Sequence, residues 1–311
     1  MTIKEILLFL ESKAPYSLQE SYDNSGLITG SPEMESNGAV ISLDCTEDVV
    51  DEAIKLGFNT VIAHHPIVFS GLKRFTGRNY VERTIIKAIK NDIAIISIHT
   101  NLDNVSHGVN KMIAEKLGLV NCQILDPIKE RLFKIVTYVP HSHAEEVLNA
   151  MFGAGAGHIG NYSECSFSAD GRGTFKGGEN TTPYVGQVGT RHTESETKLE
   201  VICPKWKIES VKKAMIAAHP YEEVAHEIIQ LENKWEEIGA GMVGELSTAV
   251  ETMEFLSFVK NKMNTGCVKY TNPTTKSISK VALCGGSGSF LLDKAIQQGA
   301  RAYLNRQYKT I

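Results

Sequence analysis

Two short segments place the strongest constraint on the fold of this 311-residue chain. Residues 60–69 read Thr-Val-Ile-Ala-His-His-Pro-Ile-Val-Phe, and residues 94–103 read Ala-Ile-Ile-Ser-Ile-His-Thr-Asn-Leu-Asp. Each begins as a short apolar run and ends in side chains that can bind a metal ion. Such runs between helical patterns are typical of strands buried on both faces of a mainly parallel sheet. We therefore predict an α/β fold with mixed, mainly parallel sheets flanked by helices.

The polar ends of these segments predict a metal site. Ligands of α/β folds bind at the carboxyl ends of the strands, so His64, His65 and Asp103 are expected to share one crevice. Imidazole and carboxylate both bind divalent zinc, iron or manganese. Because Pro66 biases His65 toward extended backbone, the strand is expected to end at His64 and the two rings to splay around two ions. A pair of ions about 3.5–4 Å apart is typical of metal-assisted hydrolysis.

Three ligands do not complete two metal sites, so further ligands must come from elsewhere in the chain or from water. A lone histidine is more often an ordinary core or surface residue, and that is the simpler interpretation of His99 and His107. Asp44 ends another strand, just before Thr46, which is expected to cap a helix through Leu56. Asp44 then either orients a ligand imidazole or serves as a turn residue before that helix.

Composition limits the class of protein. The apolar fraction is 42% and the charged fraction 22%, as in soluble globular proteins, and the length suffices for two domains. A net charge of −4 argues against nucleic acid as the main partner. No apolar run approaches the roughly 20 residues that span a bilayer, and the N-terminus lacks a signal-peptide pattern. The six cysteines form no C-x-x-C pair, which predicts reduced thiols and a cytoplasmic location.

The middle of the chain has a different pattern. From about residue 128 a strand and a helix precede glycine-rich, strand-like pieces, and a strand, a helix and a strand follow. This is the split βαβ, or ferredoxin-like, order of an α+β domain. We predict an inserted domain within a core, with the chain divided into residues 1–127, 128–232 and 233–311.

Two further groups of residues allow both a functional and an ordinary interpretation. Lys73, Arg74 and Arg78 follow the central strand, where they either bind an anion such as a phosphate or form a solvated surface. His219 and Glu223 offer metal-binding or ligand-binding groups in the insert. Since Pro220 breaks the regular helical spacing, they are better explained as residues that end a helix and satisfy each other.

Several stretches together resemble the NIF-three-like family, also named GTP cyclohydrolase 1 type 2 homologues. They are Asp23–Leu27, Leu43–Thr46, Ala63–Pro66, His99–Asp103 and Gly285–Gly288. The resemblance runs from end to end, and the insert resembles the CutA-like or PII-like domain of some members. It implies a dinuclear site for two divalent ions with His64, His65 and Asp103 among the ligands, a toroidal homohexamer, and a nucleotide or other anionic substrate. The family name suggests hydrolytic opening of a purine nucleotide ring.

The last residues depart from the family pattern. After a strand at residues 302–304, the pattern continues with an acidic stretch, a helix, and a His and a Glu that complete the two-metal site. This sequence has Arg306 and Gln307 at the acidic position and ends at Ile311. The resemblance therefore implies a shortened chain that lacks two ligands. Three classes stay open: a metal-dependent hydrolase of the cyclohydrolase type, a metal-dependent phosphoesterase, and a non-enzymatic scaffold or sensor whose insert binds a ligand.

Overall fold

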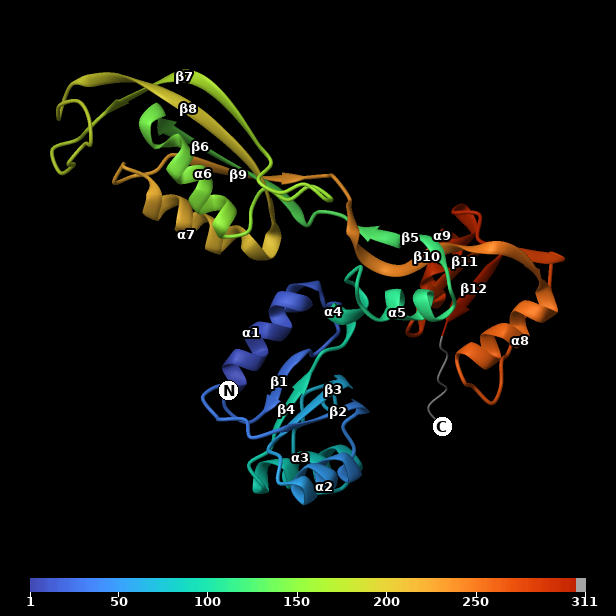
Figure 1. Cartoon of the computed structure of the whole chain (residues 1–311). Coiled ribbons are helices and arrows are strands. Elements are labelled where there is room, and N and C mark those ends of the chain that lie inside the picture. The colour runs from blue at the N-terminus through green and yellow to red at the C-terminus, as the bar shows by residue number, and fades with distance from the viewer. Residues whose placement is uncertain (306–311) are drawn as a thin grey trace. The chain divides into compact units, whose positions relative to one another are not determined.

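A computed structural model describes residues 1–305 (Figure 1). The chain divides into two compact units. The first comprises Met1–Pro127 and the segment from Glu236 onward, and the second comprises Ile128–Trp235. The described residues form three four-stranded sheets with helices against them, so the mixed α/β class is confirmed.

The first sheet carries the polar strand ends. Its order is β1-β4-β3-β2, formed by Gly26–Thr29, Ala94–Ser97, Thr60–His65 and Ala39–Asp44. Strands β2, β3 and β4 are parallel, whereas β1 is antiparallel to β4. The carboxyl ends of three strands therefore meet at one edge. Strand β3 continues to His65, which lies opposite Asp44, so the predicted end at His64 is wrong by one residue. The extended backbone that Pro66 imposes on His65 is compatible with strand pairing.

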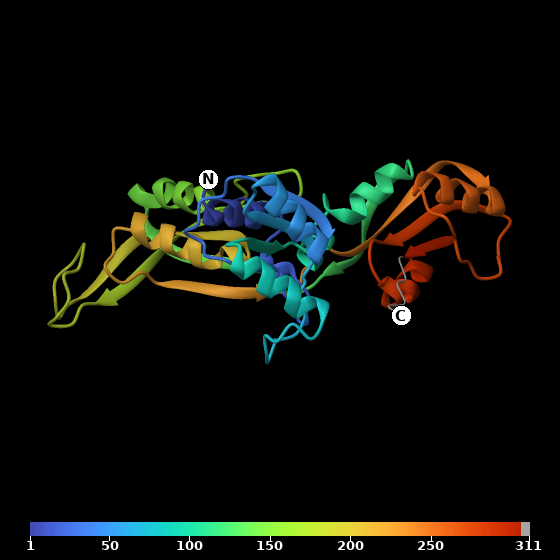
Figure 2. The same cartoon turned by 90° about the horizontal axis from the view of Figure 1, so that it is seen from below.

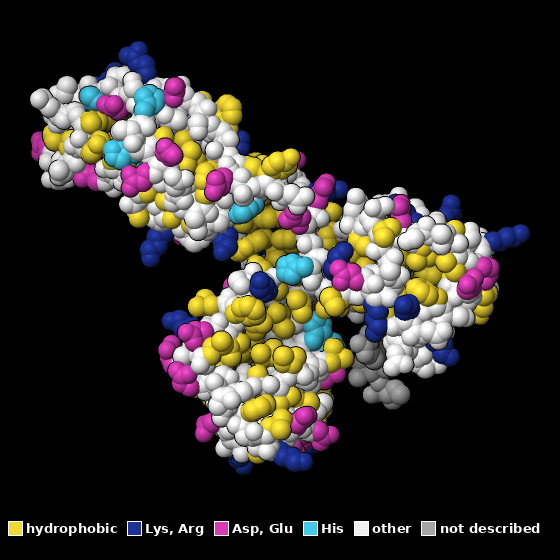
Figure 3. Space-filling view, in the orientation of Figure 1, with side chains coloured by type: hydrophobic (Ala, Val, Ile, Leu, Met, Phe, Trp, Pro, Cys, Tyr) yellow, Lys and Arg dark blue, Asp and Glu magenta, His cyan; other side chains and the backbone are white. Residues whose placement is uncertain are grey.

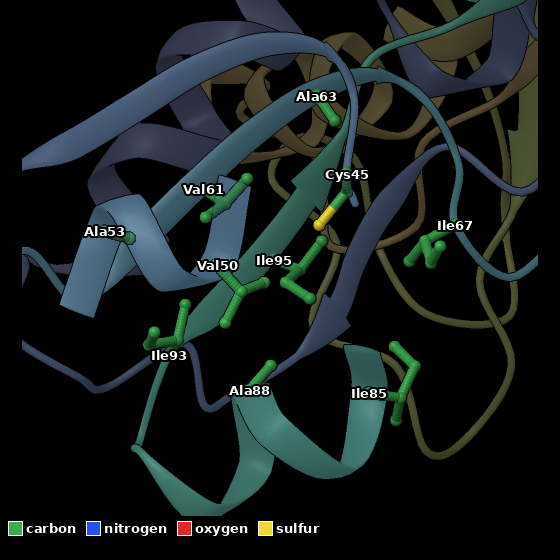
Figure 4. Packing of buried hydrophobic residues seen from close by; sticks show 10 residues of the cluster. All are labelled: Cys45, Val50, Ala53, Val61, Ala63, Ile67, Ile85, Ala88, Ile93 and Ile95. Carbon is green, nitrogen blue, oxygen red and sulfur yellow. The ribbon is translucent and has the colours of Figure 1, made fainter. Parts of the chain in front are cut away.

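Successive apolar side chains along β4 point to opposite faces of this sheet, and they are buried on both. Ile93 and Ile95 pack with helices α2 (Glu47–Leu56) and α3 (Tyr80–Lys90), as the cluster in Figure 4 shows. Ala94 and Ile96 pack on the other face with Ile3 of α1, which spans Ile3–Lys13. Burying one such isoleucine contributes about 1.5–3 kcal/mol to the stability of the fold. The side chains of β4 therefore help to stabilise the packing of helices on both faces of the sheet. The predicted cap is confirmed, because the Thr46 hydroxyl accepts the Val49 N–H.

Asp103 does not end a strand. Strand β4 stops at Ser97, and Asp103 is the last residue of the one-turn helix α4, Thr100–Asp103. The polar run after β4 therefore turns back as a helix, which keeps Asp103 near the edge where β4 ends. Helix α5, Val109–Lys116, follows directly.

The rest of the first unit is built on a second sheet of order β12-β11-β10-β5. These strands are Ala302–Asn305, Ser277–Cys284, Trp235–Glu251 and Val120–Ile128. β11 is parallel to β12 and antiparallel to β10. Helix α8, Thr252–Lys262, packs Phe255 and Val259 against Val281 and Leu283 of β11. The Gly285–Gly288 stretch leads from β11 into a 3-10 turn, Gly288–Leu291, and then helix α9, Leu292–Gln297.

The second unit has the strand and helix order that the sequence predicts for the insert. Its elements are β6 (Leu132–Pro140), α6 (Ala144–Gly153), β7 (Ser166–Lys176), β8 (Arg191–Pro204), α7 (Ile208–Ala218) and β9 (His226–Leu231). The sheet order β7-β8-β6-β9, with every neighbour antiparallel, is that of a split βαβ domain. Helices α6 and α7 lie side by side on one face of the sheet (Figure 1). The glycine-rich tract is less fragmented than predicted, because β7 pairs with β8 over all its 11 residues.

In residues 1–305, the helices are all too short or too polar to cross a bilayer. The remaining regular elements are short 3-10 turns at Tyr16–Leu18, His141–His143 and Lys205–Lys207.

Candidate metal centre

Three imidazoles meet at the carboxyl edge of the first sheet. His64 and His65 end β3, and His99 follows β4. One ring nitrogen from each lies within 4.8 Å of the others, and the ring centroids are 5.0–5.5 Å apart. Within residues 1–305 this is the one group of three or more metal-binding side chains gathered so closely. The cluster can therefore hold a metal ion, and it includes His99, which the sequence analysis left as an ordinary residue.

Asp103 supplies a carboxylate beside these rings. Its Oδ1 lies 3.7 Å from His64 Nε2 and is buried, and it accepts no hydrogen bond from the described residues. Burial raises the pKa of Asp103 to about 6, even though His99 and His65 act in the opposite direction. A buried carboxylate oxygen without a partner destabilises a fold. A cation next to Asp103 would satisfy that oxygen, so the residues fit a metal ion.

The hydrogen bonds of the rings leave the same nitrogen free on each histidine. Nδ1 of His64 lies 2.9 Å from the carbonyl oxygen of Ile98, which can only accept a hydrogen bond. Nδ1 of His65 lies 2.7 Å from Asp44 Oδ1, and Nδ1 of His99 lies 2.8 Å from Asp23 Oδ1. With the proton on Nδ1, each Nε2 keeps its lone pair for a metal. Hydrogen-bond partners on other segments thus stabilise, in all three rings, the tautomer that leaves Nε2 free to bind a metal.

The Asp44 carboxylate accepts a hydrogen bond from the His65 imidazole, which is the contact that the first of its two predicted roles requires. Asp23 makes the same contact with His99 and was missed by the sequence analysis. Hydrogen bonds from His99 and Thr100 hold the Asp23 pKa well below its usual range, although burial acts to raise it. Its position at the start of the family-like stretch Asp23–Leu27 was the one available signal.

His64 is in the charge state that a ligand needs. Burial, together with the smaller effects of the neighbouring His99 and His65, lowers the pKa of His64 to about 4. His64 is therefore neutral at pH 7. Asp103, with a pKa of about 6, is mostly ionised at that pH. Neutral imidazole and ionised carboxylate are the forms that bind metals.

Asn110 ties the glycine stretch to this site. Its side-chain N–H group donates to the backbone carbonyl of Asp103 at 2.9 Å, and its Oδ1 accepts the Gly285 N–H at 2.8 Å. A Cβ on Gly285 would come within 2.7 Å of Val109, so this close approach requires glycine. The second sheet thereby contributes to the placement of Asp103.

The other predicted groups lie outside the cluster. Lys73, Arg74 and Arg78 lie on the loop between β3 and α3 and form no ion pair within the described residues, so their role stays a prediction. His219 ends α7 as predicted, but it does not pair with Glu223. Its Nε2 donates to the Tyr138 carbonyl and its Nδ1 accepts the Tyr221 N–H, because the helix end turns the ring toward β6. The predicted departure at Arg306 and Gln307 lies outside the described residues.

Fold and site together define an α/β protein with a histidine cluster that can hold a metal ion. Residues 1–309 match the sequence model of Duf34/NIF3 (NGG1p interacting factor 3), and the chain belongs to this family. A Staphylococcus epidermidis protein called GTP cyclohydrolase 1 type 2 homolog is 36% identical over 309 residues, covering 99% of this chain and 84% of the relative. A homolog of the same name from Halalkalibacterium halodurans is 38% identical over 296 residues, covering 95% and 80%.

Solved structures agree with this assignment. The crystal structure of a Bacillus cereus protein related to NIF3 superposes with a TM-score of 0.87 at 40% identity, covering 99% of this chain and 83% of that one. A Staphylococcus aureus protein superposes with a TM-score of 0.76 at 30% identity, covering 99% and 82%.

Replacing Asp44 by alanine is expected to weaken metal binding by about 10–100-fold, because the His65 ring loses the carboxylate that orients it. Competition with a coloured chelator measures the change. Asp48→Ala, which removes an exposed carboxylate from the first turn of α2, is the matched control and should bind metal like the wild type. Equal affinities for the two variants would contradict an orienting role for Asp44.

Proposed function

We propose that this protein is a metal-dependent hydrolase that works at His64, His65, His99 and Asp103. The observation that carries the proposal is the unpartnered Asp103 Oδ1 beside three imidazoles whose Nδ1 atoms are all engaged elsewhere. A bound divalent cation supplies Lewis acidity, which polarises a substrate oxygen and lowers the pKa of water.

The surrounding side chains support a nucleotide as the substrate. Tyr22 and Phe69 are exposed and stack at a centroid distance of 6.3 Å, and Phe69 also lies 5.8 Å from the His99 ring. Exposed aromatic rings offer a surface on which a purine can stack. The loop that follows Phe69 carries Lys73, Arg74 and Arg78, which suit phosphate groups. A purine nucleotide such as GTP is therefore the substrate class we favour.

The proposal includes a second divalent ion. The described residues offer four protein donors at the cluster, which suffice for one ion of zinc, iron or manganese. A second ion needs donors from water or from residues outside the described part of the chain. Metal analysis of purified protein gives the number of ions directly: two per chain supports a dinuclear centre, and one per chain contradicts it.

A substrate panel tests the reaction class. Metal-loaded and chelator-treated protein are compared on GTP and on simple phosphate esters, while purine absorbance and released phosphate are followed separately. Loss of purine absorbance from GTP in the metal-loaded protein alone is the expected result. Release of phosphate without loss of purine absorbance indicates a phosphoesterase instead. If neither substrate reacts while metal stays bound, hydrolysis is contradicted.

The second candidate function is that of a non-enzymatic scaffold or sensor. It is favoured by one observation, a cavity that lies wholly within the second unit. The split βαβ order of residues 128–232 supports the proposal that this unit is a CutA-like or PII-like insert. Deletion of residues 128–232 separates the two candidates, since a sensor loses its response to ligand whereas a hydrolase keeps its metal and its turnover.

We also propose that the protein is a cytoplasmic homo-oligomer, a hexamer by analogy with the family resemblance. Hydrophobic side chains gather on the surface over α1, where Leu8 and Phe9 are largely exposed (Figure 3). Ile41 on the edge strand β2 is 80% exposed, and such an edge is easily covered by another chain. All six cysteines are free thiols, which fits a reducing compartment. Light scattering measures the mass, and a monomer would contradict the proposal.

A further inference from the structure

The second unit contains a cavity of about 790 Å³ on the face of its sheet that α6 and α7 leave uncovered. Its floor is made by β7 and β8. Its walls come from residues 177–184, which follow β7, and from Tyr221–Ala225, which precede β9. In Figures 1 and 2 the loop after β7 projects beyond the ends of α6 and α7. The size is that of pockets which take a small organic molecule.

Strand register shows which side chains form the floor. Gly171 lies opposite Glu196, and Phe175 lies opposite His192, so these four share one face. The buried Thr197 hydroxyl donates a hydrogen bond to Asp170 on the helix-covered face. Arg172 and Lys176 are an even number of residues from Asp170 along β7, so they project from that same face. Arg172 and Lys176 therefore alternate to the face opposite Glu196, although both residues contribute to the cavity lining. A Cβ on Gly173 would clash with the Glu196 carboxylate, so this carboxylate lies over Gly173 and requires glycine there. A Cβ on Gly171 would meet no atom within 4 Å, so the neighbouring part of the floor is open.

Among the three glutamates on this face of β8, Glu196 alone lines the cavity, and it forms no ion pair within residues 1–305. Along the same face of β8, His192 pairs with Glu194 at 2.8 Å and Lys198 pairs with Glu200 at 2.5 Å. Glu196 lies between these pairs, is 8% exposed, and accepts one hydrogen bond, from the Tyr221 hydroxyl at 2.9 Å. A buried ionised carboxylate requires a positive or hydrogen-bond-donating partner.

The nearby histidine does not supply that charge. His219 lies against the Tyr221 ring at a centroid distance of 5.0 Å, and burial lowers the pKa of His219. Its Nδ1 accepts the Tyr221 N–H, so the ring is in its neutral form. Within residues 1–305 Glu196 therefore has a hydrogen-bond donor but no ion-pair partner, and Lys198, which also lines the cavity, pairs with Glu200 instead.

Aromatic rings surround the same space. Phe175 and Tyr184 each lie 6.1 Å from the Tyr221 ring, measured between centroids. All three line the cavity. Ring faces attract cations and stack on flat molecules. Histidine and acidic side chains lie among hydrophobic ones on the lobe at the upper left of Figure 3, which is the second unit.

We propose that this cavity binds a flat organic cation, whose N–H groups donate to Glu196 and whose ring lies against Tyr221, Phe175 and Tyr184. Amidines and protonated nitrogen heterocycles have this chemistry, because two parallel N–H groups match the two oxygens of a carboxylate. The site belongs to the second unit alone and does not involve the metal ligands.

Benzamidine, a flat ring with a forked cationic group, is the probe that tests the proposal. Ligand-observed NMR titration on the full-length protein should show saturable binding, with the same affinity before and after chelator treatment. Benzoate, which has the same ring and the opposite charge, should not bind. Because binding is followed directly, the result is independent of any hydrolase activity and of the proposed metal centre.

Two variants locate the binding. Glu196→Gln keeps the size of the side chain and should weaken benzamidine binding by at least about tenfold. Gly171→Leu fills the open part of the cavity floor beside the Glu196 carboxylate without a backbone penalty and should abolish binding. The matched controls are Glu209→Gln, an exposed carboxylate on α7, and Gly153→Leu, an equally open position away from the cavity. Both controls should bind like the wild type.

Three results would overturn the proposal: no saturable binding of benzamidine, equal binding of benzoate, or wild-type affinity in Glu196→Gln. If Gly171→Leu unfolds, the affinity of Glu196→Gln for benzamidine still tests the proposal. Light scattering on each variant shows whether the mass of the particle has changed, so that a filled cavity is distinguished from an altered assembly.

Discussion

Replacing both His64 and His65 by alanine is expected to remove bound metal almost completely. Four-ligand zinc sites have apparent binding free energies of roughly 10–16 kcal/mol, or roughly 3 kcal/mol per ligand, so losing two ligands should weaken binding by at least about a thousandfold. Mass spectrometry of metal content after dialysis measures the stoichiometry. Any metal-dependent turnover should disappear with the metal.

A matched double variant controls for the loss of histidines in general. His107 and His158 are both exposed and lie outside the cluster, so replacing the pair by alanine should leave the metal content unchanged. Wild-type stoichiometry in the His64 and His65 double variant would show that the cluster is not the metal site. Turnover that survives without those two rings would eliminate the hydrolytic mechanism even if metal were still present.

Asp103→Asn is expected to have opposite effects on metal binding and on stability. It removes a charged ligand, so metal affinity should fall at least about a hundredfold. In metal-free protein it also removes a buried ionised carboxylate whose Oδ1 lacks a hydrogen bond. The pKa of about 6, against an ordinary value of 3.8, corresponds to about 3 kcal/mol, so the variant should be about 1–3 kcal/mol more stable at pH 7.5.

The gain in stability expected for Asp103→Asn increases with pH. A carboxyl group whose pKa is raised on folding destabilises the fold only when it is ionised. The cost from Asp103 is therefore absent at pH 4, grows between about pH 4 and 6, and is complete above about pH 6. Denaturant unfolding of chelator-treated wild type and Asp103→Asn should give similar stabilities at pH 4 and diverge toward pH 7.5. A variant that is less stable than the wild type at pH 7.5 would show that the Asp103 carboxylate already has a partner.

Local patterns were enough to predict much of the fold. The apolar run that ends in His64 and His65 forms strand β3, and Thr46 caps α2, because backbone propensity and capping act within a few residues. The order of helices and strands in the insert could also be predicted, because the hydrophobic residues of each element recur with the period of a helix or a strand. The single long strand β7 was not, because glycines at positions 171 and 173 weaken a strand pattern.

The candidate site was only partly predictable for a different reason. Which strands become neighbours is decided by packing far along the chain, and periodicity contains no such information. His99 joins the cluster because β4 lies beside β3, and its partner Asp23 is 76 residues away along the chain. The spacing of His99 and Asp103, four residues apart around a helical turn, was the signal that was overlooked.

The central claim is that one cation gathers these side chains. Anomalous X-ray scattering, collected at the absorption edge of the metal from crystals of metal-loaded protein, tests it most directly. The account predicts a peak within bonding distance of Nε2 of His64, His65 and His99 and of Asp103 Oδ1, at about 2.0–2.2 Å for zinc. A metal peak at any other place in the chain, with these four side chains still unbound, would contradict it.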